Sequence, residues 1–159
     1  METSVPESAK EIKPLLKIIG AVYDNLPFNR HLGLKVAFVE IDRAGFTFTM
    51  RNELIGNSVH GILHGGVISA VLDATGGLTA TAAAIERMPG LSHDEIAQRI
   101  ARIGTIDMRV DYLRPGRGVQ FHSAGTIMRT GRKVAVTRME LKNQEDLLIA
   151  VGTGTYIVG

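Results

Sequence analysis

One segment restricts the possible folds more than any other. Residues 65–88 have the length of a long helix, end before Pro89, and consist largely of Ala, Thr, Ser and Gly. Gly76 and Gly77 fall in the middle of this segment, and each interior glycine costs a helix about 1 kcal/mol relative to alanine. A helix that accepts this cost is expected to pack at close range against its neighbours. A sheet wrapped around the helix would explain its composition.

The remaining sequence supplies strands for such a sheet. Residues 34–41 and 46–50 alternate between apolar and other side chains around a turn at 42–45, which predicts a β-hairpin. Residues 52–66 lack clear periodicity and are expected to form a loop. Turn residues separate four further predicted strands, at 105–113, 119–129, 133–142 and 147–158.

Two shorter helices are also expected. Residues 10–26 carry apolar side chains at helical spacing, although Pro14 suits this helix only if it lies in the first turn. Pro27 is expected to close the segment. Residues 92–95 have the sequence of a capping box and predict a short helix that runs to about Ile103.

These elements predict an α+β fold in which helices pack on a mostly antiparallel sheet. A length of 159 residues fits one domain. We expect residues 1–26 to form a tail, frayed over residues 1–9, and a helix, and residues 27–159 to form the domain itself.

Composition excludes several classes of function. The absence of cysteine removes thiol catalysis, disulfides and cysteine-ligated metals, and agrees with a reducing compartment. A net charge of +2 and 5% aromatic residues argue against nucleic-acid binding. With no secretory signal and no uninterrupted run of 18 apolar residues, we expect a cytoplasmic protein without a membrane span.

Two glycines, Gly65 and Gly66, come at the expected N-terminus of the long helix. The N–H groups of a first turn have no partner within the helix and carry the positive end of its dipole. Without side chains, these residues would let a ligand oxygen approach closely, as in an oxyanion site. A plain loop-to-helix turn that needs glycine for steric reasons remains the alternative.

Asp73 interrupts an otherwise apolar run of this helix, between Leu72 and Ala74. A carboxylate is costly to bury without a partner, so Asp73 is either functional, exposed or paired with an arginine. It lies about 12 Å along the helix from Gly65. If both act on one carbonyl group, they should come from different subunits, as two antiparallel helices related by a two-fold axis would provide.

The spacing Asn57…His64-Gly65-Gly66…Asp73 resembles the signature of the PaaI-like thioesterases, the phenylacetic-acid-degradation branch of the hotdog superfamily. Similarity extends from about Pro27 to the C-terminus and includes residues 105–116, 131–135 and 150–156. The resemblance implies a hotdog fold, an antiparallel sheet wrapped around a long central helix. It also implies acyl-CoA thioester hydrolysis by homodimers that often pair into tetramers.

The resemblance implies roles for individual residues. Gly65 would donate its N–H to the thioester carbonyl oxygen, and Asp73 of the partner subunit would act as nucleophile or general base. Asn57, or Ser58 if the loop is one residue longer, would hold the leaving group or the attacking water. Thr105 would orient that water.

Other residues of the pattern would shape the site or contact coenzyme A. His64 is expected to shape the loop, whereas His60 has no assigned role. No metal site is expected, because His60 and His64 have the spacing of a ligand pair but lie in a glycine-containing loop and not on a helix. No cofactor is expected, since coenzyme A is part of the substrate. Contacts to coenzyme A are expected from Gly66 and from four basic residues at two turns, Arg114, Arg117, Arg132 and Lys133.

Two alternatives to hydrolysis fit the sequence less well. Hotdog hydratases place a histidine five residues after the acid, where this chain has Leu78. A non-catalytic acyl-CoA-sensing dimer would usually carry an added DNA-binding or regulatory segment, for which residues 1–26 are too short. The acyl group stays open, because residues 89–104 are longer than in compact relatives and would remodel the acyl pocket.

Overall fold

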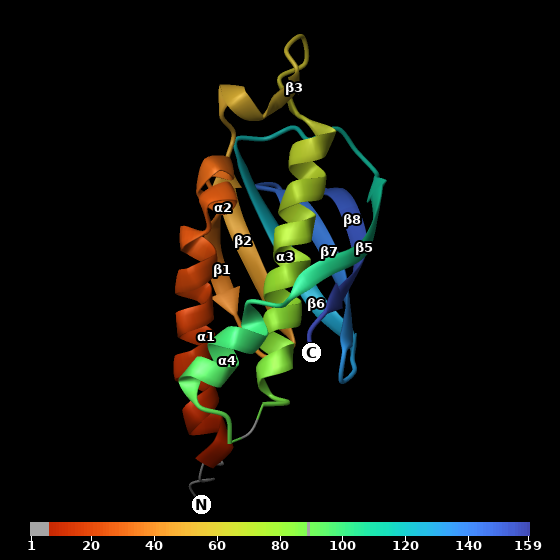
Figure 1. Cartoon of the computed structure of the whole chain (residues 1–159). Helices are drawn as coiled ribbons and strands as arrows, with labels where there is room; N and C mark the ends of the chain where they lie inside the picture. Colours follow the sequence, from red (N-terminus) through yellow and green to blue (C-terminus); the bar gives the residue numbers. More distant parts are fainter. Residues whose placement is uncertain (1–6, 89) are drawn as a thin grey trace, which may run out of the picture.

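The computed structural model describes residues 7–88 and 90–159, and its centre is the 21-residue helix α3 (Gly65–Ile85). This helix lies against one face of a six-stranded antiparallel sheet (Figure 1). The strand order is β1-β2-β6-β7-β8-β5. The strands are β1 (Lys35–Val39), β2 (Arg43–Thr49), β5 (Gly104–Tyr112), β6 (Gln120–Thr130), β7 (Val134–Asn143) and β8 (Leu148–Ile157). The predicted α+β hotdog fold is confirmed.

Small residues let α3 approach the sheet closely. A Cβ atom on Gly76 would lie 2.1 Å from the Tyr156 hydroxyl oxygen, and one on Gly125 of β6 would lie 2.4 Å from Thr79 Oγ1. Both distances are far below van der Waals contact. Within the described chain, α3 is the one helix with the length and composition of a membrane span, but 72% of that window is buried inside the molecule. The apolar composition of α3 therefore reflects its burial in the protein core.

The first hairpin forms as predicted, but its turn lies at residues 40–42 rather than 42–45. Gly45 belongs to β2, where a Cβ atom would lie 2.4 Å from the carbonyl oxygen of Ser123 on β6. The glycine serves close packing in the sheet instead of the turn.

The N-terminal helices differ from the prediction. Helix α1 (Glu7–Asn25) contains Pro14 in its interior, and residues 7–9 belong to the helix, whereas residues 1–6 lie outside the described chain. Pro14 is exposed, so water can bind the carbonyl oxygen left without a backbone donor, while Leu16 and Ile19 anchor the helix in the core. Pro27 begins a second helix, α2 (Pro27–Leu32), because its fixed φ suits a first helical position.

Two further segments complete the fold. The capping box is confirmed, with Ser92 and Glu95 bonding reciprocally at the start of α4 (His93–Ile100). The expected loop at 52–66 is partly ordered into a 3₁₀ turn, η1 (Asn52–Leu54), and a small hairpin of β3 (Ile55–Asn57) and β4 (Ile62–Leu63). These strands are too short to show periodicity.

Candidate active site

The N-terminus of α3 leaves one backbone donor free. The His64 side chain caps the helix: its Nδ1 accepts from the Gly66 N–H at 2.8 Å. The His64 carbonyl accepts from Val67 and Ile68, at 3.0 and 3.2 Å. The Gly65 N–H therefore remains the first-turn donor without a partner among the described residues.

The cap also explains the second glycine. A Cβ atom on Gly66 would lie 2.9 Å from His64 Nδ1, inside the space that the imidazole occupies. Since Nδ1 accepts a hydrogen bond, the proton of the neutral ring belongs on Nε2. His64 and Gly66 thus fix the geometry in which Gly65 presents its N–H.

The Asp73 carboxylate is half-buried and held by two hydroxyl groups. Thr105 Oγ1 donates to Asp73 Oδ1 at 2.8 Å, and the Tyr156 hydroxyl lies 3.3 Å from the same oxygen. Thr105 and Tyr156 face each other in the β5–β8 ladder, so a single register delivers both donors. Asp73 Oδ2 accepts no hydrogen bond from the described residues and is available to a ligand or water.

Two tyrosines adjoin this carboxylate. Burial, reinforced by the negative charge of Asp73, raises the pKa of Tyr156 far above its ordinary value. Burial also raises the pKa of Tyr23, against the opposing effect of its hydrogen bond to Thr81, and Asp73 adds to the rise. Both hydroxyl groups therefore stay protonated at neutral and mildly alkaline pH. Tyr156 can thus keep donating to Asp73 there.

The sequence alone indicates no role for either tyrosine. Tyr156 lies in a segment that the family resemblance includes, yet nothing in its local sequence indicates that it faces Asp73. Only the strand order, which pairs β8 with β5 beside α3, brings it there.

A cavity of about 440 Å³ opens beside Asp73. The corner between α1 and α2 forms one wall, held by the bond that Asn29 Nδ2 donates to the Tyr23 carbonyl at 2.9 Å. Apart from Asp73, Thr105 and Tyr156, the lining is mostly apolar and includes Tyr23, Leu26, Phe28, Ala70, Ala74 and Ile103. The arrangement suits a carboxylate acting on a ligand with an apolar part.

One chain does not bring all the predicted site residues together. Gly65 lines a different cavity, of about 350 Å³, with Tyr112 and Arg114, and lies about 12 Å from Asp73 along the helix. Asn57 closes the exposed turn after β3, where its Oδ1 accepts from the N–H groups of residues 59 and 60 at 3.1 and 3.2 Å.

The four basic residues divide into two groups at opposite ends of β6 (Figure 1). Arg114 donates to the Leu148 carbonyl at 2.9 Å, and Arg117 to the His60 carbonyl at 3.2 Å. Arg132 and Lys133 lie in the β6–β7 turn. Within one subunit, the pair Arg114 and Arg117 therefore lies apart from the pair Arg132 and Lys133.

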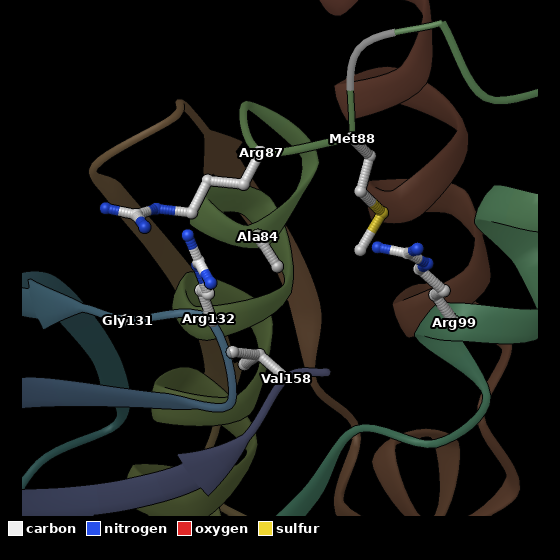
Figure 2. Close-up of a pocket in the computed structure, with 7 residues that line it drawn as sticks. All are labelled: Ala84, Arg87, Met88, Arg99, Gly131, Arg132 and Val158. Carbon is white, nitrogen blue, oxygen red and sulfur yellow. The ribbon is translucent and has the colours of Figure 1, made fainter.

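Arg132 has other arginines near it. Arg87 and Arg99 line the same cavity of about 370 Å³, at the C-terminal end of α3. In Figure 2 the Arg87 and Arg132 guanidinium groups gather on one side, and Arg99 reaches in from α4 on the other. Guanidinium groups in this arrangement suit phosphate oxygens. In residues 7–88 and 90–159, no group of three His, Asp or Glu side chains could hold a metal ion.

Comparisons with known proteins extend these observations. The family pattern described as the thioesterase superfamily matches residues 60–150. The medium/long-chain acyl-CoA thioesterase YigI of Escherichia coli K12 is 46% identical over 145 residues, which cover 91% of this chain and 94% of that protein.

Solved structures agree. A Shewanella oneidensis protein related to the thioesterase superfamily has a TM-score of 0.88 and 46% identity, covering 98% of this chain and all of that one. The E. coli PaaI protein of the phenylacetic acid degradation operon shares the fold, with a TM-score of 0.70, 20% identity and coverage of 87% and 88%. The resemblance inferred from the sequence motif is confirmed.

Proposed function

This chain belongs to the thioesterase superfamily, and from that membership we propose that it hydrolyses medium- or long-chain acyl-CoA thioesters to free acid and coenzyme A. The observation that carries the proposal is the Asp73 carboxylate, held by Thr105 and Tyr156 at the edge of a largely apolar cavity. The proposed length of the acyl group is taken from the name of a relative, the medium/long-chain acyl-CoA thioesterase YigI, which is 46% identical to this chain.

The proposed chemistry uses the free oxygen of Asp73. Acting as a base, Oδ2 takes a proton from water while the water oxygen bonds to the thioester carbonyl carbon. Acting as a nucleophile, Oδ2 bonds to that carbon itself, and water then hydrolyses the anhydride. In both routes the C–S bond breaks, and the thiolate leaves readily because a thiol has a pKa near 8.5. The reaction consumes only water and needs no cofactor.

The oxyanion donor in this proposal is the Gly65 N–H of a partner subunit. Two copies of α3 packed antiparallel would set each Asp73 beside the other chain's Gly65, the donor left free by the His64 cap. Strand β5 supports such pairing because it is an edge strand with exposed apolar side chains, Ile106 and Tyr112. We therefore propose a homodimer, with a dimer of dimers as the larger assembly.

The same pairing gives the basic residues a common role. Residue 84, beside the Arg87–Arg132 cavity, lies about 16 Å beyond Asp73 along α3. In an antiparallel dimer, Gly65 of the partner subunit would lie beside Asp73. The partner's β5–β6 connection, which carries Arg114 and Arg117, would then lie on the side of Asp73 that faces the Arg87–Arg132 cavity. The two sets of basic residues, which lie apart within one chain, would thus lie on the same side of the shared active site. This arrangement supports a role in binding the phosphates of coenzyme A.

The decisive experiment measures coenzyme A release from acyl-CoA thioesters of 2 to 16 carbons and from phenylacetyl-CoA. Native protein is compared with Asp73→Asn, and with Asp42→Asn as a matched control at an exposed turn, at equal folded concentrations. We expect Asp73→Asn to lose at least a few hundredfold in kcat and Asp42→Asn to match the native protein. Activity unchanged in Asp73→Asn, or no hydrolysis of any thioester, would refute the proposal. Acyl-CoA binding without turnover would favour the sensing dimer.

A further inference from the structure

We propose that the groove between α1 and α4 binds the aliphatic tail of the acyl group and selects its length. The inference rests on the proposed function, because it places the reacting carbonyl beside Asp73. The groove has a volume of about 320 Å³ and is lined by Ile18 and Val22 of α1, Ile96 and Ile100 of α4, and Ile85 of α3.

The groove continues into the cavity beside Asp73. Tyr23 lines both, and its hydroxyl is occupied by Thr81 Oγ1 at 2.9 Å, which leaves the ring as the shared wall. Ile103 of the cavity follows Ile100 of the groove by three residues, and its N–H donates to the Ile100 carbonyl at 3.0 Å. A ligand that starts at Asp73 therefore meets a continuous apolar surface in this direction.

An exposed apolar stripe marks the same route. Ile18 and Val22 line the groove, Leu26 and Phe28 line the cavity, and the four side chains are between 39% and 58% exposed. A contiguous patch of this kind on a small protein usually marks a binding surface. Because it leads from the candidate carboxylate into the groove, the chemistry that fits it is an alkyl chain.

The dimensions favour a medium or long chain. Ile18 lies seven residues before Asn25, the last residue of α1, which is about 10 Å along the helix. An extended chain advances about 1.2 Å per bond, so this stretch accommodates roughly eight or nine carbons. Acyl groups of four to six carbons would end near Asp73 without entering the groove.

The charge distribution separates the two ends of the substrate. The residues described as lining the groove include no charged side chain, so the phosphates of coenzyme A gain nothing there. Arg87, Arg99 and Arg132 instead line the cavity at the end of α3. The tail and the nucleotide are thus assigned to different surfaces.

The test fills the groove and leaves the carboxylate intact. Ala97 lines the groove and is exposed, so Ala97→Phe should block it without disturbing the core, whereas its exposed neighbour Gln98 does not line the groove and Gln98→Phe adds a ring outside it. Each buried methylene contributes about fourfold to kcat/KM. We expect Ala97→Phe to lower the ratio of kcat/KM for 12-carbon to 4-carbon acyl-CoA at least tenfold, and Gln98→Phe to leave it unchanged.

A binding measurement separates this inference from the proposed function. Cis-parinaric acid, a fluorescent fatty acid, should bind the native protein and Gln98→Phe but not Ala97→Phe, whether or not any thioester is hydrolysed. Val22→Asp, which places a charge on the exposed wall, should show the same loss if Ala97→Phe does not fold. An unchanged length ratio with unchanged binding would overturn the inference, as would a change of sedimentation in Val22→Asp, which would mean that another protein chain covers the groove.

Discussion

At the scale of single residues, Gly65 allows the proposed oxyanion donor to be removed without removing the helix start. Proline is favoured at the first position of a helix and has no N–H. His64 has φ −65° and ψ 138°, a conformation that a following proline accepts. Gly65→Pro is therefore expected to fold and to lose about 10²- to 10³-fold in kcat.

Gly65→Ala is the matched variant. It keeps the N–H, and its Cβ would meet the Tyr112 ring at 3.5 Å, an ordinary contact. We expect its kcat to stay within a few-fold of the native value, with circular dichroism verifying the fold of both variants. Equal losses in the two variants would mean that the position is needed only for steric reasons.

Residue roles were predictable from the sequence only where the motif is local. The run His64-Gly65-Gly66 identifies a helix start, because the cap and its donor are two residues apart. Tyr156 reaches Asp73 across 83 positions of the chain, and no local pattern encodes such a contact. Likewise, Arg132 gathers with Arg87 and Arg99 only after folding.

At the scale of elements, the two central glycines of α3 should respond to alanine with opposite signs. A Cβ on Gly76 would lie 2.1 Å from the Tyr156 hydroxyl, whereas one on Gly77 would meet the Tyr23 hydroxyl oxygen at 3.5 Å. Gly76→Ala should lower the free energy of unfolding by about 1–3 kcal/mol through overpacking. Gly77→Ala should raise it by up to about 1 kcal/mol through helix propensity.

Urea unfolding followed by circular dichroism measures both changes. Displacement of Tyr156 from Asp73 should also reduce hydrolysis by Gly76→Ala, whereas Gly77→Ala should remain active. A stabilising effect of Gly76→Ala would contradict the close packing of α3 on β8.

Elements themselves were predicted well where periodicity and turn chemistry agree. The four later strands begin and end within one residue of their predicted bounds, since clear turn residues separate them. Prolines were less informative: Pro14 lies inside α1, because tertiary packing of Leu16 and Ile19 outweighs one missing hydrogen bond. Pro27 starts a helix as easily as it ends one.

At the scale of the whole molecule, an active site shared between two subunits predicts that dimers of two different inactive variants regain activity. In a dimer of one Asp73→Asn chain and one Gly65→Pro chain, one site would carry both defects and the other none. Random mixing of equal amounts gives half heterodimers, so activity should recover to about a quarter of the native value.

Mixing the two purified variants provides this measurement. Co-expression with two different affinity tags, followed by purification of the heterodimer, should give about half of the native activity, because one of its two sites is intact. Each variant alone serves as the control for background hydrolysis. If Asp73 and Gly65 acted within one chain, every site in the mixture would contain a defect and no activity would return.

The pairing of Thr105 with Tyr156 has a consequence for how the protein matures. Strand β5 is synthesised before β6, β7 and β8, yet its ladder partner is β8. During translation β5 must therefore wait, unpaired, while the 35 residues from Leu113 to Leu147 emerge. The two hydroxyl groups that hold Asp73 meet only when this ladder closes. A nascent chain accordingly acquires the arrangement around its carboxylate at the moment its sheet is completed, and partly made chains lack it.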